Sequence, residues 1–206
     1  NLMDRAIISR TEKEAKEHAI LQNLDTSFQK IDELPFDFER RRMSVIVKDD
    51  SNVVSMVTKG ALEEMLNIST HVEYRGEVIP LTEDIPQEVL AEVGQLNRQG
   101  LRVLGVGYKS GLREDYAYTV TDERDMILTG YLAFLDPPKP SAAPAIQALL
   151  EHGVKTKILT GDNEKVTQAI CEKVGLDVEH ILLGADIDQM TDQELAEVVE
   201  KVTVFA

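Results

Sequence analysis

Three prolines within five residues, at Asp136–Pro140, divide the chain into two parts with different patterns of apolar residues. A strand or helix that reaches such a run ends there, because proline lacks the backbone donor and its ring fixes φ. Before the run, apolar and polar residues alternate in Phe28–Leu34, Met43–Lys48 and Val53–Lys59, which predicts antiparallel strands. After it, short apolar stretches alternate with helical patterns, which predicts a parallel sheet with helical crossovers. The expected fold class is therefore α+β followed by α/β.

The remaining elements of the first part are predicted from the spacing of apolar residues and from the glycine and turn residues at their ends. Gly100 marks the end of one helix, as a C-terminal glycine cap does. We expect helices over Leu2–Asn23, Gly60–Asn67 and Ile85–Gln99, a hairpin over Val72–Leu81, and strands over Leu101–Tyr108 and Ile127–Leu135.

The part after the prolines is predicted to alternate strictly between helix and strand. Ser141 is expected to cap the first helix, and Thr191 and Glu194 form a capping box for the last one. We expect helices over Ser141–Gly153, Asn163–Val174 and from Thr191 onward, and strands over Val154–Leu159, His180–Leu183 and Val202–Phe205.

The charge of the chain excludes two classes of partner. Lys and Arg total 22 and Asp and Glu total 37 in 206 residues, so the formal charge is −15. Such a surface repels phosphate backbones and anionic lipid, so neither nucleic acid nor a membrane surface is an expected partner. The single cysteine, Cys171, excludes an internal disulfide and a cysteine-based zinc site, and the four histidines lack metal-ligand spacing. We expect no metal site.

Phe36–Val45 is the most unusual local segment, since it joins two phenylalanines to three consecutive arginines in an acidic protein. This composition suits a nucleotide, because a base stacks on an aromatic ring while guanidinium donors reach phosphate. The alternative is that the phenylalanines are core residues and the arginines a solvated strand edge, which composition alone favours.

Three further positions have the chemistry of an anion site. Lys59 and Gly60 lie where a predicted strand meets a helix, and Arg102 is the one charge in an apolar strand. Arg102 needs a partner, which a structural carboxylate supplies as well as a ligand phosphate. Thr160–Asp162 follows a predicted parallel strand, where open α/β sheets hold ligands, although a tight turn with Asp162 or Asn163 as N-cap explains it equally well.

Five segments, taken in their order along the chain, resemble the cytoplasmic part of P-type cation-transporting ATPases. They are Phe36–Val45, Lys59–Ala61, Gly100–Leu104, Asp136–Pro138 and Thr160–Asp162. The likeness covers nearly the whole chain. The segments Asn1–Asp4 with Ala6–Ile7, Phe36–Val45 and Asn97–Arg102 are most similar to the bacterial magnesium-transporting branch.

The resemblance implies a role for each candidate residue, with ATP and Mg²⁺ as cofactors. Phe36 would stack on adenine, and Lys59 would lie at the floor of the nucleotide pocket. Arg41 and Arg102 would reach the phosphates, and Asp4 would lie near the adenine amino group. The other implied residues are Met43, Gly60 and Leu104 lining the pocket, Thr160, Gly161 and Asp162 at the phosphates and Mg²⁺, and Asp136 at the hinge between domains.

The resemblance also implies what the chain is a piece of. We expect most of a nucleotide-binding domain, residues 1–129, and part of a haloacid dehalogenase-like phosphorylation domain, residues 130–206. The partners would be ATP and the other domains of the pump, on the cytoplasmic side of the bacterial inner membrane, without direct membrane contact. The family's phosphorylated aspartate, in Asp-Lys-Thr-Gly-Thr, is absent from the sequence, so the chain is expected to bind ATP without hydrolysing it.

Three other interpretations are open at this point. The chain can be a soluble phosphatase or phosphotransferase that uses Thr160–Asp162, with Asp136 as nucleophile, or part of a pump for another cation. It can also be an acidic interaction module without a ligand, which leaves Phe36–Val45 and Lys59 unexplained.

Overall fold

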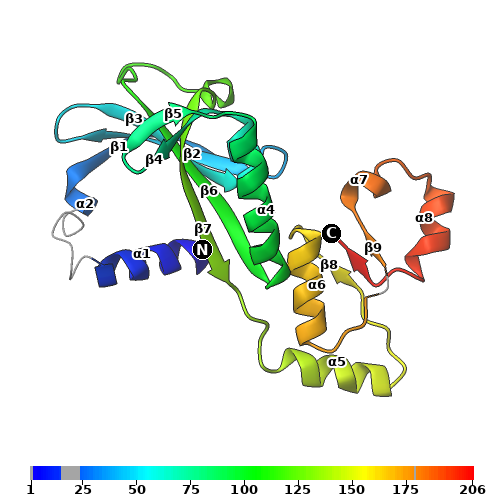
Figure 1. The fold of residues 1–206 in the computed structure, drawn as a ribbon. Coiled ribbons are helices and arrows are strands. Elements are labelled where there is room, and N and C mark those ends of the chain that lie inside the picture. Colours follow the sequence, from blue (N-terminus) through cyan, green and yellow to red (C-terminus); the bar gives the residue numbers. More distant parts are fainter. Residues whose placement is uncertain (1, 15–23, 179) are drawn as a thin grey trace. The chain divides into compact units, whose positions relative to one another are not determined.

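The computed structural model describes residues 2–14, 24–178 and 180–206, and they form two compact units. Unit 1 comprises Asn1–Leu90 and Leu104–Leu132, and unit 2 comprises Ala91–Val103 and Ala133–Ala206, so the division falls within α4, β6 and β7. Each unit has its own apolar core. Figure 1 labels the elements of both.

Most elements before the prolines match the predicted types, but the short helix at Leu24–Ser27 and the 3₁₀ turn were not predicted, and Gly60, expected in a helix, lies in a strand. The helices are α1 (Leu2–Glu14), α2 (Leu24–Ser27), α3 (Leu62–Asn67) and α4 (Asp84–Arg98), with a 3₁₀ turn at Val120–Asp122. The strands are β1 (Phe28–Asp37), β2 (Arg42–Asp49), β3 (Val54–Ala61), β4 (Ser69–Tyr74), β5 (Glu77–Pro80), β6 (Leu101–Ser110) and β7 (Met126–Leu135). The end of the helix predicted over Leu2–Asn23 lies outside the described residues.

These strands form one seven-stranded sheet in the order β1-β2-β3-β6-β7-β4-β5. The pairs β1–β2, β2–β3, β3–β6 and β4–β5 are antiparallel, but β4 pairs with β7 in parallel. The expectation of an antiparallel sheet is therefore wrong for this pair, and the sheet is mixed. The cause is topological: β4 and β7 meet only through a long connection, so no turn between them imposes antiparallel pairing.

Strict alternation along β2 and β3 gives the sheet two different faces. Val54, Met56 and Thr58 are buried, whereas the residues between them are only half-buried. Ile46 of β2 is buried on the same face, and the core there also includes Leu34, Tyr118 and Met126. The opposite face carries the odd-numbered residues of β2 and β3, because successive side chains on a strand point to opposite sides.

After the prolines, unit 2 contains a three-stranded, wholly parallel sheet in the order β8-β10-β9. Its strands are β8 (Ile158–Leu159), β9 (Ile181–Leu182) and β10 (Val204–Phe205), each shorter than predicted, and its helices are α5 (Ala142–Glu151), α6 (Glu164–Lys173), α7 (Gly184–Ile187) and α8 (Asp192–Val199). Helix α7 was not predicted. The Thr191–Glu194 capping box is confirmed, but Ser141 makes no side-chain cap hydrogen bond, so its predicted capping role is wrong.

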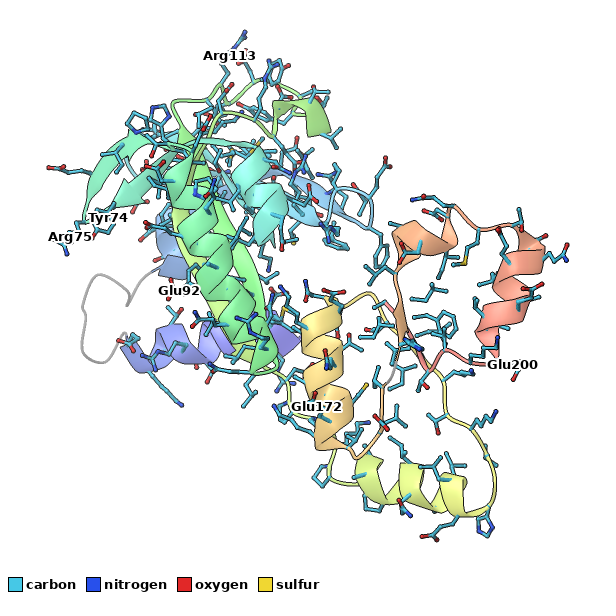
Figure 2. The ribbon with its side chains drawn as sticks, turned by 45° about the vertical axis from the view of Figure 1, so that its right-hand side comes forward. Tyr74, Arg75, Glu92, Arg113, Glu172 and Glu200 are labelled. Carbon is cyan, nitrogen blue, oxygen red and sulfur yellow. The ribbon has the colours of Figure 1, made fainter. Side chains whose placement is uncertain are left out.

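The acidic residues that give the chain its charge lie largely on the surface. Figure 2 labels Glu92, Glu172 and Glu200, and all three are exposed. The same figure shows Tyr74 and Arg75 at the tip of the β4–β5 hairpin, where the guanidinium lies 5.1 Å from the ring centroid.

Candidate functional site

A cavity of about 280 Å³ lies in unit 1 on the sheet face opposite the core. Its walls are alternate residues of three neighbouring strands, with Met43 directly opposite Lys59, and Lys59 directly opposite Val106. The complete lining is Ile7, Met43, Val45, Val57, Lys59, Leu104, Val106 and Leu132. The cavity is thus apolar with one cationic group, and it brings together the predicted residues Met43, Lys59 and Leu104.

Lys59 and Asp4 form an ion pair beside this cavity. Asp4 and the cavity residue Ile7 are three residues apart on α1, so they share one face of that helix. The hydrogen bond from Lys59 holds the pKa of the Asp4 carboxyl below its ordinary value. Asp4 therefore contributes a counter-charge to Lys59 in this structure.

Gly60 and Arg41 meet where the β1–β2 turn crosses the end of β3. A Cβ on Gly60 would lie 2.4 Å from the Arg42 Cβ and 2.7 Å from the Arg41 carbonyl oxygen, so only glycine fits. Arg41 has a φ of +49° and donates to Glu64 at 2.7 Å, and its side chain is 53% exposed. Of the three consecutive arginines, Arg41 is the one that faces outward.

Phe36 lies in a bulge of β1 next to the cavity wall. Leu34 pairs with Ser44 and Asp37 with Arg42, so Pro35 and Phe36 both lie opposite Met43. Such a bulge re-aims a side chain relative to the regular strand. Phe36 is half-exposed and makes an edge-to-face contact with Phe38, with centroids 5.4 Å apart. Phe36 is therefore a half-exposed aromatic residue on the strand next to Met43, but it is not among the residues that line the cavity.

Arg40 and Arg42 have a different environment from either interpretation of the sequence. Both are largely buried and both donate to Glu123, whose side chain is fully buried. The solvated strand edge is therefore wrong for these two arginines. Glu123 was missed at the sequence level, because nothing in the run Asp122–Asp125 distinguishes one acidic residue from its neighbours.

The other lining residues were also missed, although the sequence carried a signal for three of them. Val45, Val57 and Val106 each lie two residues from a predicted site residue, and period-2 alternation places them on the same face. Ile7 and Leu132 come from distant elements, and no spacing indicates them.

In unit 2, Arg102 is placed between two of the predicted carboxylates. It donates to Asp162 at 2.7 Å and lies 3.4 Å from Asp136, while its buried Nε has no hydrogen-bond partner among the residues that the structure describes. The partner that an isolated charge in an apolar strand requires is thus supplied by carboxylates.

Thr160, Gly161 and Asp162 form the turn between β8 and α6. The Asp162 amide donates to the Thr160 hydroxyl at 3.1 Å, and Gly161 is exposed. The N-cap is Asn163, whose side chain accepts from the Lys165 amide at 2.9 Å, so Asp162 is left to bind Arg102. The turn follows the carboxyl end of a parallel strand, as predicted.

None of the helices in the described ranges has both the length and the apolar character of a membrane span.

Comparison with known proteins relates these features to one family. The family model described as P-type ATPase, cytoplasmic domain N, matches residues 1–141. The chain is 46% identical over all 206 residues to a magnesium-transporting ATPase, P-type 1, of Salmonella typhimurium, and 44% identical to that of Escherichia coli K12. It is 33% identical over 187 residues, 90% of its length, to calcium-transporting ATPase 1 of Lactococcus lactis.

The chain spans 22% of the length of the two magnesium-transporting relatives and 21% of the calcium-transporting one. The family match covers more than half of the chain, including every residue that lines the cavity. This protein therefore belongs to the family of P-type ATPases, as a chain that contains their cytoplasmic domain N.

Proposed function

We propose that this chain is the ATP-binding portion of a magnesium-transporting P-type ATPase, and that the cavity beside Lys59 receives the adenine base. The observation that carries the proposal is the convergence of Met43, Lys59 and Leu104, three residues singled out from the sequence, on one apolar cavity. Magnesium, as the transported ion, is supported by the two relatives with the highest quoted identity. The calcium-transporting relative makes Ca²⁺ the alternative cargo.

The cavity suits part of a nucleotide. Its volume of about 280 Å³ lies just below the ~300 Å³ at which pockets for drug-sized ligands begin. A flat aromatic base matches the apolar walls, while triphosphate would remain outside. Phe36 would then stack on the base, and Arg41 and Lys59 would supply positive charge to the phosphates. Gly60 allows the β1–β2 turn to approach this edge of the pocket.

We further propose that residues 1–129 form the nucleotide-binding domain and residues 130–206 part of a haloacid dehalogenase-like phosphorylation domain. The wholly parallel sheet of unit 2, with a Thr-Gly-Asp turn after β8, supports this assignment. Thr160, Gly161 and Asp162 would meet the phosphates and Mg²⁺, and Arg102 would exchange a carboxylate for phosphate. Asp136, at the start of the proline run, would mark the hinge.

In the intact pump, ATP bound with Mg²⁺ would phosphorylate an aspartate that lies outside this chain. Phosphoryl transfer depends on positioning and on electrostatic stabilisation, so the role of this portion is to deliver the nucleotide. The partners would be the remaining domains of the pump, on the cytoplasmic side of the bacterial inner membrane. Without the acceptor aspartate, the 206 residues should bind ATP and release no phosphate.

Titration of the chain with ATP, followed by amide NMR, tests the proposal. We expect shifts centred on Phe36, Lys59 and Gly60, and no inorganic phosphate after prolonged incubation. Phe36→Ala should weaken ATP binding about tenfold, because stacking contributes ~1–3 kcal/mol per base. Lys59→Ala should also weaken it.

Tyr74→Ala is the matched control, since Tyr74 is an exposed aromatic residue at the β4–β5 tip and should leave binding unchanged. If millimolar ATP shifts none of these amides, the binding assignment is wrong. Phosphate release by the chain would instead show a hydrolase.

A further inference from the structure

Glu123 is a buried carboxylate with three donors from the β1–β2 region. Its Oε2 accepts from the guanidinium of Arg40 and from Arg42 Nε at 2.9 Å, and its Oε1 accepts from Ser44 Oγ at 2.7 Å. Ser44 is also hydrogen-bonded to Thr58 of β3 at 2.8 Å. A buried carboxylate is tolerated only where it is paired and hydrogen-bonded, and these contacts meet that requirement.

The same contacts hold the β1–β2 turn from both sides. Arg40 also donates to Asp37 and, at 2.7 Å, to the Pro35 carbonyl, so one guanidinium joins β1 to Glu123. Arg42 begins β2 and lies 3.9 Å from Glu64. Because the planar guanidinium presents several donors in fixed directions, these pairs define the path of the turn as well as its charge.

The backbone around Glu123 is itself fixed. The Val120–Asp122 turn before it is closed by the Thr119–Asp122 capping box. Lys109 of β6 donates to the carbonyls of Asp122 and Arg124, which flank Glu123, the second at 3.1 Å. Glu123 therefore lies in a connection that Lys109 ties to β6, and it can act as a fixed anchor.

The anchored turn carries Phe36 and Arg41, the two exposed groups that the proposed function assigns to the base and the phosphates. Phe36 lies in the bulge before the turn. Arg41 lies within the turn, and its amide donates to the Asp37 carbonyl at 3.0 Å. The Arg41 carbonyl accepts from the Ala61 amide, also at 3.0 Å, which ties the turn to β3. Any movement of Arg40 and Arg42 would displace Phe36 and Arg41 relative to Lys59.

We infer that Glu123 is a positioning residue for nucleotide binding: through Arg40 and Arg42 it holds the β1–β2 turn so that Phe36 lies over the base. The inference rests on the proposed function. It also divides the three arginines, since Arg40 and Arg42 bind Glu123 and only Arg41 is available to phosphate.

A double-mutant cycle with ATP tests this inference in the full chain. Glu123→Gln keeps the acceptor for Ser44 but removes the charge that binds two guanidinium groups. With the variant fully folded by its amide spectrum, the Kd for ATP should rise about tenfold, the loss expected when the stacking residue is misplaced. In a Phe36→Ala background, the same change should raise the Kd less than about twofold.

A second variant and a control complete the test. Arg40→Lys keeps the charge but cannot make all three side-chain contacts of Arg40, so it should also raise the Kd for ATP. If Glu123→Gln does not fold, this variant tests the inference in its place. Glu114→Gln removes an exposed carboxylate paired with Lys48 and should leave the Kd unchanged.

Two results would overturn the inference. The first is a wild-type Kd for ATP in the folded Glu123→Gln variant, or in the folded Arg40→Lys variant if Glu123→Gln does not fold. The second is that the effects of Glu123→Gln and Phe36→Ala on the Kd are fully independent. If the wild-type chain binds no ATP, or if Phe36→Ala leaves ATP binding intact, the proposed function itself fails. These two measurements therefore separate failure of the proposed function from failure of the inference about Glu123.

Discussion

At the scale of single residues, three identical neighbours have three different environments. Arg40 joins Glu123 to β1, Arg42 joins Glu123 at the start of β2, and Arg41 turns outward with a positive φ. Composition treats them as one cationic cluster. Their contacts differ because a turn sends consecutive side chains in different directions, and a buried carboxylate lies on only one side.

Gly60 gives a residue-scale prediction about close packing. We expect Gly60→Ala to lower the free energy of unfolding of unit 1 by ~1–3 kcal/mol, because its Cβ would overlap the Arg42 Cβ and the Arg41 carbonyl oxygen. Urea unfolding monitored by the amides of β2 and β3 measures the change. Gly161→Ala is the control, since apart from its two chain neighbours no heavy atom of the described residues lies within 4 Å of its added Cβ. Equal stability of both variants would show that the β1–β2 turn yields easily.

At the scale of elements, the local sequence determines where helix α4 ends. Arg98 is the last helical residue, and Gly100 follows with a φ of +83° while its amide donates to the Asn97 carbonyl at 2.9 Å. Glycine adopts this conformation without the steric cost that other residues meet. The predicted stop at Gly100 is thus confirmed.

The same helix allows a paired prediction with opposite signs. Gly94→Ala should raise the free energy of unfolding by ~0.5–1 kcal/mol, because Gly94 lies inside the helix with room for a Cβ 3.7 Å from Lys165 Nζ. Gly100→Ala should lower it by ~1–2 kcal/mol, since alanine is strained at positive φ. Thermal unfolding of both variants provides the measurement. Destabilisation by Gly94→Ala would contradict the helix assignment at that residue.

The short strands of unit 2 show where local pattern is insufficient. The strand predicted over Val154–Leu159 pairs only at Ile158 and Leu159, and the Val154 amide instead bonds the Leu149 carbonyl at the end of α5. Apolar sequence favours extended structure, but a strand exists only where a neighbour supplies hydrogen-bond partners.

At the scale of the whole molecule, the two units have separate apolar cores. The core of unit 1 includes Ile46, Met56 and Met126, and that of unit 2 includes Cys171 and Val204. Because each unit has its own core, we expect the two units to unfold in separate transitions.

We therefore predict that a core substitution affects one unit. Ile46 is fully buried, so Ile46→Ala should lower the stability of unit 1 by ~2–5 kcal/mol. Hydrogen exchange should show faster exchange in β2, β3 and β6 and unchanged protection in α6. Val204→Ala, at a fully buried position of unit 2, is the reciprocal control. Equal loss of protection in both units would show that they unfold together.

Much of the candidate site could be predicted because its residues lie in short motifs. Lys59 was identified from the segment where a predicted strand meets a helix, and Met43 and Leu104 were implied by the family resemblance of their segments; the structure places all three on one cavity. Ile7 and Leu132 were not, since no spacing relates them to those segments. Asp4 was named by resemblance, but its ion pair with Lys59, 55 residues away, was not predicted.

The sequence by itself determined what depends on neighbours along the chain: the period-2 strands and their two faces, the helix that ends at Gly100, the break at Asp136–Pro140 and the family motifs. Tertiary structure alone decided the parallel pairing of β4 with β7 and the partners of Arg40 and Arg42. Glu123 lies 83 and 81 residues from those arginines, and its contacts with them depend on how strands distant in sequence are brought together. Backbone and side-chain periodicity act over a few residues, whereas burial of a charge is settled only when the whole sheet has assembled.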